Sequence, residues 1–323
     1  INTASTLSLG RGTTTGSIVG DITNNGILAL TRSNDFTVAG LISGSGRVDA
    51  LGAGTATLTG ANTYTGGTNV FGALRLTGDG ALGTGGVSVA SPGSLHIDAP
   101  NGGSYTFTQA LTGNGTLLAN LAAATDTFAF GAATGRAFTG TVELGQGQFS
   151  LSGDNTTALT QATLQLDAGN VTTVAPADQT IGNLTLNGGT LAWSGQTPPG
   201  SPLGIVNVTD LTLTSGNVQV DVPVTSGLPN PVPSPGVNLL AQDDGEIQSQ
   251  LIAAGGTVTG DASSLTLTDS AGQVVNNPQT LAITEGGTTV ANGSYDFMLS
   301  TGANNDGLYP VSYTHLTLPT TER

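Results

Sequence analysis

Short segments of the chain begin with glycine and then alternate apolar and variable residues. Gly72-Ala-Leu-Arg-Leu76 and Gly93-Ser-Leu-His-Ile97 show this plainly, because the second and fourth positions after glycine are apolar in both. Successive side chains of a β-strand point to opposite faces. Each apolar pair is therefore expected to point into one core, and the residue between them, Arg75 or His96, is expected to face outward.

The glycine-led segment recurs at a spacing close to one coil of a solenoid. Most consecutive starts are one coil apart, as from Gly72 to Gly93; the interval from Gly147 to Gly189 is twice as long and corresponds to two coils. The lengthened interval before Gly147 predicts a loop inserted after Ala119. The segments begin at Gly26, Gly46, Gly72, Gly93, Gly115, Gly147, Gly189 and Gly216. The predicted inward pairs are Leu28 and Leu30, Leu74 and Leu76, Leu95 and Ile97, Phe149 and Leu151, Leu191 and Trp193, and Val218 and Val220. The predicted outward residues are Asp49, Arg75, His96, Ser150 and Gln219.

Residues that tolerate a positive φ lie between these segments, where each coil must bend sharply. They are found in Asn24-Asn25-Gly26, Asn187-Gly188-Gly189 and Ser215-Gly216-Asn217. Frequent bends, in units too short for a helical crossover, favour an all-β chain. We predict a right-handed single-stranded parallel β-helix over residues 1–222, with an antiparallel β-sandwich or hairpin array as the alternative.

Composition agrees with many short strands and turns. Glycine supplies 50 of 323 residues, whereas charged residues make up 8% and aromatic residues 4%. Helices with ion-paired faces need more charge than this. Because cysteine is absent, the chain has no disulfide framework, no thiolate metal site and no cysteine nucleophile.

The charge balance excludes one class of partner. The net charge is −15, lysine is absent, and the cations are six arginines. Such a chain cannot neutralise a phosphate backbone, so nucleic acid is excluded as a partner, and anionic surfaces are disfavoured.

The sequence contains no run of about eighteen apolar residues, so it predicts no membrane-spanning helix. Residue 1 is Ile, from which we expect a removed leader or a fragment.

The composition of the chain and its pattern of strand candidates change after Val222. Residues 223–236 are rich in proline, which cannot donate to a sheet ladder, so they are expected to form a linker or loop. Residues 237–311 form a separate β-rich segment. Its strand candidates are Asn238–Ala241, Gly256–Thr259, Ser264–Asp269, Gln279–Ile283 and Ser294–Leu299.

Two stretches carry a family resemblance. Leu58-Thr-Gly-Ala-Asn-Thr-Tyr-Thr-Gly-Gly-Thr68 resembles the autotransporter-associated strand repeat of pertactin-like and AIDA-like passenger domains, and Val237 to Tyr309 is similar to the passenger segment just before the translocator. The resemblance implies a cell-surface β-helical stalk exported through the periplasm, acting as an adhesin without catalysis. It also implies a twelve-stranded outer-membrane translocator barrel downstream, and as partners either surface molecules of host or neighbouring cells, or further copies of the chain.

The C-terminal end of the chain is interpreted separately. Ser312-Tyr-Thr-His-Leu-Thr-Leu-Pro-Thr320 can be back-translated into a sequence that resembles a transposase-library sequencing adapter. We therefore interpret residues 312–323 as an assembly artefact and exclude them from the fold prediction.

Candidate chemistry is sparse. Gly-x-Gly recurs at residues 44/46, 52/54, 113/115 and 145/147, and repetition without any lysine favours coil turns over a phosphate-binding loop. His96 and Asp98 lie near Ser91 and Ser94, which suggests a hydrolytic triad, although an outward histidine on a repeat position is more often solvated.

Scattered acids and clustered aromatics complete the candidates. The acids Asp126, Glu143, Asp154, Asp167, Asp178, Asp210 and Asp221 lie far apart, and Asp243, Asp244 and Glu246 resemble an exposed turn more than a calcium site. Trp193, Phe128, Phe130, Phe138 and Phe149 are expected to fill the core, with an exposed glycan-binding groove as the alternative. We predict no catalytic, metal or cofactor site. A β-helical carbohydrate-active enzyme or glycan-binding module, and a self-associating module, remain as alternatives.

Overall fold

A computed structural model describes residues 1–77, 82–98, 103–132, 137–193, 203–220, 246–248, 250–275, 279–285 and 288–317. The chain is almost entirely β-strand, and its parallel strands stack into a β-solenoid, which confirms the predicted fold class. It divides into two compact units: unit 1 comprises residues 1–172 and 180–189, and unit 2 comprises residues 173–179 and 190–323.

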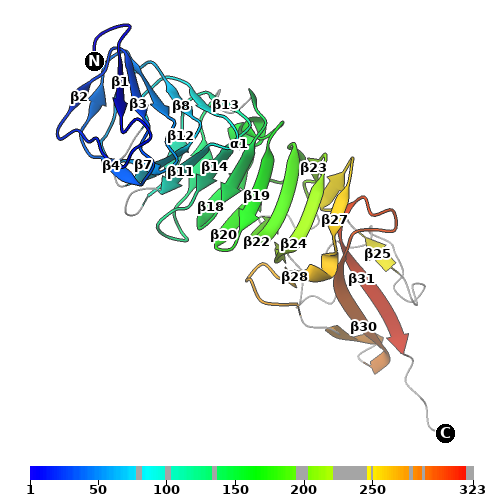
Figure 1. Cartoon of the computed structure of the whole chain (residues 1–323). Coiled ribbons are helices and arrows are strands. Elements are labelled where there is room, and N and C mark those ends of the chain that lie inside the picture. Colours follow the sequence, from blue (N-terminus) through cyan, green and yellow to red (C-terminus); the bar gives the residue numbers. More distant parts are fainter. Residues whose placement is uncertain are drawn as a thin grey trace. The chain divides into compact units, whose positions relative to one another are not determined.

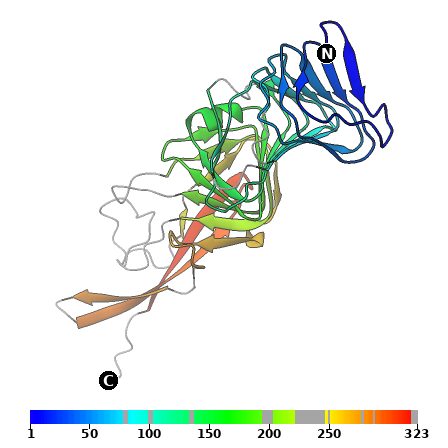
Figure 2. The ribbon, with the colours of Figure 1, turned by 90° about the vertical axis from the view of Figure 1, so that its left-hand side faces the viewer.

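Sheet A of unit 1 contains seven parallel strands, one from each of seven successive coils. Figure 2 shows the N-terminal coils in blue, wound one after another. The strands are β1 (Thr6–Leu9), β3 (Ile27–Leu30), β6 (Arg47–Ala50), β8 (Thr68–Val70), β10 (Val87–Val89), β13 (Leu111–Gly113) and β16 (Ala137–Phe138).

Sheet B of unit 1 runs along another side of the coils and continues beyond the last strand of sheet A (Figure 1). Its strands are β4 (Phe36–Val38), β7 (Thr55–Leu58), β9 (Ala73–Thr77), β11 (Ser94–Asp98), β14 (Thr116–Ala119), β17 (Thr141–Leu144), β19 (Thr163–Asp167) and the first part of β22 (Asn183–Trp193). The other elements up to residue 180 are β2 (Ile22–Thr23), β5 (Ile42–Ser43), β12 (Tyr105–Phe107), β15 (Phe128–Phe130), β18 (Gly147–Leu151), α1 (Gly153–Ala158), β20 (Asn170–Val174) and β21 (Gln179–Thr180).

Apolar ladders fill the interior of the coils. Leu74 pairs with Leu95, and Leu76 pairs with Ile97, on adjacent strands of sheet B. All four side chains are at most 2% exposed. The predicted inward pairs of the other segments are also buried, and Arg75 and His96 are neighbours on the outer face. Stacking like residues at strand spacing buries each one against the coils before and after it.

One step of the predicted register is wrong. Gly46 precedes β6 of sheet A, whereas Gly72 precedes β9 of sheet B, so the two glycines do not begin equivalent strands. A Cβ on Gly46 would lie 2.3 Å from the Gly26 carbonyl oxygen, and one on Gly72 would lie 2.2 Å from that of Gly52. Both corners of a coil therefore require glycine, and the pattern cannot distinguish them.

The predicted loop after Ala119 is affected in the same way, because its two flanking glycines also begin strands that are not equivalent. Ser94 of β11 pairs with Thr116 of β14, and Thr116 pairs in turn with Thr141 of β17, so the coil that follows Thr116 is slightly longer than the one before it. Gly147 begins β18, which is not the strand equivalent to β14. The long interval before Gly147 thus combines one lengthened coil with a change of strand position.

The predicted turn glycines have two different causes. Gly188 and Gly216 have φ angles of +103° and +139°, as predicted. Gly26 does not have a positive φ, and a Cβ there would lie 2.2 Å from the Ser5 carbonyl oxygen. At that turn glycine is required by close approach of the neighbouring coil.

Unit 2 combines parallel coils with antiparallel strands. Val206 pairs with Ile252, and β24 pairs in parallel with both β27 and β28, so parallel stacking continues beyond residue 236. β30 pairs antiparallel with β29 and β31. The elements are β23 (Val206–Val208), β24 (Leu211–Gln219), β25 (Glu246–Gln248), β26 (Ile252–Ala254), β27 (Val258–Gly260), the 3-10 helix η2 (Ala262–Ser264), β28 (Leu265–Thr268), β29 (Gln279–Glu285), β30 (Thr288–Ser300) and β31 (Gly307–Thr317).

Several predictions about this half remain open. The Pro-rich segment 223–236 and the candidate strand 238–241 lie outside the described residues, and the domain boundaries at 222, 236 and 311 stay predictions. Residues 312–317 continue β31, but their origin as an artefact also stays a prediction. Among the described residues, every helix is too short or too polar to cross a membrane.

Candidate binding surface

A row of polar side chains crosses the outer face of sheet A. Asp49 of β6, Asn69 of β8, Ser88 of β10 and Thr112 of β13 occupy equivalent positions on four successive strands. They alternate along their strands with buried residues, so the row faces away from the core. Adjacent members are about 4.8 Å apart because that is the spacing of paired strands.

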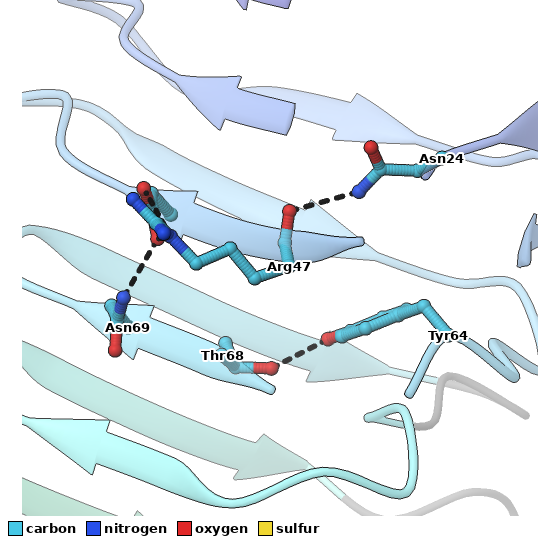
Figure 3. Close-up of polar contacts among 6 residues, drawn as sticks. Asn24, Arg47, Tyr64, Thr68 and Asn69 are labelled. Atoms are coloured by element: carbon cyan, nitrogen blue, oxygen red, sulfur yellow. Dashed lines mark hydrogen bonds and ion pairs between the residues drawn. The ribbon is translucent and has the colours of Figure 1, made fainter. Parts of the chain in front are cut away.

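Asp49 anchors one end of this row. The Arg47 Nε donates to both carboxylate oxygens of Asp49, at 3.0 and 3.1 Å, and the Asn69 Nδ2 donates to Oδ1 at 2.8 Å (Figure 3). The Asp49 side chain is only 10% exposed. Asp49 therefore lies on the outer face of the sheet, as predicted, but its own neighbours cover its side chain.

A second row, of small residues, runs beside the polar row. The residues directly before Thr68, Val87 and Leu111 are Gly67, Gly86 and Ala110; Gly67 is covered by its neighbours, and Gly86 and Ala110 are exposed. Without large side chains there, an open hollow of about 360 Å³ remains on the outer face of sheet A. Its lining consists of Thr65, Gly66, Gly67, Thr68, Asn69, Gly86, Val87, Ser88, Ala110 and Thr112.

Buried polar contacts hold the coils that form the floor of the hollow. The hydroxyls of Tyr64 and Thr68 are 2.6 Å apart inside the solenoid, and burial raises the pKa of Tyr64 (Figure 3). The Asn24 Nδ2 donates to the Arg47 carbonyl oxygen at 2.8 Å, which ties β6 to the preceding turn. The Tyr64–Thr68 contact thus holds β8 on the interior side of the hollow.

The residues suggested as a triad are only partly brought together. His96 Nε2 lies 3.0 Å from Ser94 Oγ, but the Asp98 carboxylate pairs with Arg75. The backbone N–H of Ser91 donates to Asn114 on the next coil. Burial lowers the pKa of His96, an effect that Asp98 opposes and Arg75 adds to. This arrangement lacks the carboxylate-oriented imidazole that a triad uses.

Described carboxylates mainly accept hydrogen bonds from the chain itself. Asp126 accepts from the backbone N–H groups of Gly103 and Ala123, and Asp210 accepts from that of Thr257. Within the described ranges, no three His, Cys, Asp or Glu side chains group as metal ligands. The suggested calcium turn at Asp243, Asp244 and Glu246 lies outside the residues whose side chains are described.

Two neighbouring acids lie on the outer face of sheet B. Glu143 and Asp167 are on the adjacent strands β17 and β19, and the pKa of Glu143 is raised first by burial and then by Asp167. Asp167 accepts hydrogen bonds from the side chains of Gln165 and Asn187. Asp167 is thus held by its own strand and by the next coil.

The aromatic residues are interior. Trp193 is 3% exposed, and its Nε1 donates to the Gly204 carbonyl oxygen at 2.8 Å. Phe128 stacks on Phe149 and meets Phe130 edge to face inside unit 1. Core filling is confirmed, and the hypothesis of a glycan-binding groove at these aromatic residues is wrong.

The hollow on sheet A was missed by the sequence prediction. The sequence prediction gave its glycines, Gly66, Gly67 and Gly86, no role of their own. A signal was present, because small residues precede the inward positions Thr68, Val87 and Leu111 on three successive coils. This row of small residues can be recognised only when the pairing register of the strands is known, and the glycine pattern alone does not give that register.

The site and fold together define a parallel β-solenoid with a polar, hollowed outer face. The chain is 38% identical over 279 residues to the uncharacterized lipoprotein YdeK of Escherichia coli K12, covering 78% of this chain and 21% of that protein. It is 34% identical over 273 residues to the uncharacterized protein YuaQ of the same strain, covering 82% and 20%. It is also 31% identical over 180 residues to the adhesin BmaC autotransporter of Brucella suis biovar 1, covering 50% and 5%.

The chain, which folds as a β-solenoid, is therefore a weak partial homologue of an autotransporter adhesin. The chain spans about a fifth of the length of the two Escherichia coli relatives. No family model matches it. No solved structure matches it either.

Proposed function

We propose that the chain is part of a cell-surface stalk that acts as an adhesin in the manner of autotransporter passengers. The observation that supports this most is the 31% identity to an autotransporter adhesin over half of the chain. The similarity to a lipoprotein of Escherichia coli also supports a cell-envelope location. In the complete protein, we expect an outer-membrane translocator.

The physical character of the solenoid suits this role. A solenoid buries a continuous core as it grows, so its length does not depend on disulfides. Its outer faces are polar, with a net charge of −15 and no lysine in the whole chain. Low charge of one sign keeps an extended surface soluble without fixing it to an oppositely charged partner. Surface molecules of host or neighbouring cells, or further copies of the chain, are the proposed partners.

The test uses cells that express the complete gene. Antibodies raised against the purified chain should label intact cells, and protease added outside should remove the label. Cells expressing the gene without the coils of residues 1–193 should adhere less to a host-cell monolayer or to one another. The control compares the amounts of both proteins at the surface, using a tag outside the deleted coils. Labelling only after the cells are opened, or unchanged adherence, would overturn the proposal.

A further inference from the structure

We propose that the hollow on the outer face of sheet A binds an extended, uncharged oligosaccharide. This inference rests on the proposed adhesive function and names the ligand class of one surface. The hollow is bounded on one side by three members of the polar row, Asn69, Ser88 and Thr112, and its floor is the small-residue row Gly67, Gly86 and Ala110.

The shape of the hollow suits a chain that crosses the strands. The polar groups repeat at about 4.8 Å from coil to coil, so they follow the stacking direction of the solenoid. A ligand lying in the small-residue row would meet one hydrogen-bonding side chain at each coil. Such a row matches a polymer with polar groups at regular intervals.

The chemistry of the row favours hydroxyl groups. Within the described part of the chain, the Ser88 hydroxyl and the Asn69 side-chain carbonyl have no partner, and Thr112 makes one long contact of 3.4 Å to the Val87 carbonyl oxygen. Together they offer both donors and acceptors, as sugar hydroxyls require. The strand N–H and C=O groups beneath are already paired, so an extended peptide would gain no ladder here.

The charges of the hollow favour a neutral ligand. The residues that line the hollow include no arginine, and the Nε of Arg47 on a nearby strand donates to Asp49, so the lining itself offers no cation to a carboxylate or sulfate. The net charge of −15 repels acidic polymers. An uncharged sugar meets neither obstacle.

The backbone conformation at Gly86 does not require glycine, although this residue lines the hollow. A Cβ there would meet only the Ala110 carbonyl oxygen at 3.6 Å, an ordinary contact, and Gly86 does not have a positive φ. By contrast, Gly67 has a φ of +88°, and its Cβ would lie 2.7 Å from a carbonyl oxygen. The fold therefore accepts a side chain at residue 86, and glycine there keeps the hollow open.

The experiment titrates neutral oligosaccharides into the whole chain. Cellohexaose, maltohexaose and xylohexaose are the probes, with oligogalacturonate and a Ser/Thr-rich peptide as comparisons, and binding is followed by calorimetry. Gly86→Leu fills the hollow, and Gly103→Leu is the matched control, because a Cβ at Gly103 meets nothing within 4 Å and Gly103 does not line the hollow. Ser88→Ala removes one hydroxyl while keeping the space.

We expect at least one neutral probe to bind and Gly86→Leu to weaken it by about tenfold or more, as blocking a contact centre does. Ser88→Ala should weaken it less, and Gly103→Leu should not change it, with equal melting temperatures for all variants. Binding by no neutral probe, binding only by the acidic sugar or the peptide, or equal binding by Gly86→Leu would overturn the proposal.

The two proposals fail in different ways. Cells that adhere, with a chain that binds no sugar in the hollow, would overturn the ligand assignment and leave the adhesive function standing. Sugar binding that Gly86→Leu abolishes, in cells whose adherence does not depend on residues 1–193, would support the ligand assignment and overturn the adhesive function.

Discussion

Buried polar side chains in unit 1 occupy positions that the repeat otherwise fills with apolar residues. Thr68 stands in a ladder between Val48 and Val87, yet its hydroxyl has a partner in Tyr64, at 2.6 Å. A buried polar group is tolerated when it is hydrogen-bonded, and it is costly once its partner is removed. Such a pair fixes one coil against sliding in a stack of similar coils.

Tyr64→Phe should therefore destabilise the chain by about 1–3 kcal/mol, because the Thr68 hydroxyl loses its partner in the core. Adding Thr68→Val should recover most of the loss, since valine matches its neighbours in the ladder. Urea unfolding followed by circular dichroism measures both changes. A double variant less stable than Tyr64→Phe alone would contradict the assignment.

His96 should make the stability of the folded chain depend on pH, in a direction set by its pKa shift. Its folded pKa lies below the unfolded value of 6.5, mainly because of burial. The unfolded chain therefore binds more protons, and stability falls as the pH drops below 6.5. Between about pH 7.5 and about pH 5.5, the urea midpoint of the wild-type chain should fall more than that of His96→Gln. Equal falls in the two proteins would show that His96 makes no such contribution.

At the level of elements, side-chain carboxylates and amides link successive coils at their corners. Asn25 Oδ1 accepts from the Ser45 N–H at 3.0 Å, and Asp35 Oδ1 accepts from the Thr55 N–H at 2.7 Å. At a corner the backbone leaves the sheet ladder, so its N–H groups need other acceptors. These contacts preserve the stacking where the backbone ladder is interrupted.

Asp210 links two coils that are far apart in sequence. Its Oδ1 accepts from the Thr257 N–H at 2.8 Å and from the Thr257 hydroxyl at 2.7 Å, and both bonds lower its pKa. Asp210→Ala should speed hydrogen exchange at the Thr257 amide, whereas Asp210→Asn keeps an acceptor and should preserve most of the protection. The link should also weaken as the pH falls below the ordinary value of 3.8. Unchanged exchange in Asp210→Ala would refute this role.

At the scale of the whole molecule, stability is expected to be local. In a solenoid each coil contacts mainly its neighbours, so stability is approximately a sum of coil and interface contributions. Leu95 lies in an apolar ladder of unit 1, whereas Trp193, the single tryptophan, belongs to unit 2. The two residues therefore offer separate probes of the two units.

Leu95→Ala should cost about 2–5 kcal/mol, because it opens a cavity in a fully buried ladder. The urea midpoint measured by circular dichroism should fall clearly, while the midpoint measured by Trp193 fluorescence should move less. The exposed Leu51 supplies the control, since Leu51→Ala should change neither midpoint appreciably. Identical shifts by both probes would instead indicate a single cooperative unit.

Much of the fold could be predicted because alternation reports burial directly. The pairs Leu74 and Leu76, and Leu95 and Ile97, were placed inward correctly. The step from Gly46 to Gly72 was not, because close approach between coils requires glycine at both corners. Alternation also says nothing of what covers an outward residue, so the hydrogen-bonded Asp49 could not be foreseen.

The hollow escaped prediction for a related reason. Gly67 and Gly86 look alike in the sequence, but only Gly67 is required by its backbone conformation. The difference between a glycine that makes a turn and one that leaves space depends on neighbours that lie on the adjacent coils. Those neighbours are known only once the strands are paired.

The adhesive role of this chain is tested most directly by attaching the purified protein to inert beads. Beads carrying the folded chain should adhere to host or bacterial cells, or to each other, above the level of beads carrying the chain after irreversible unfolding. Adherence that is equal for the folded and unfolded chain, or absent for both, would contradict the account.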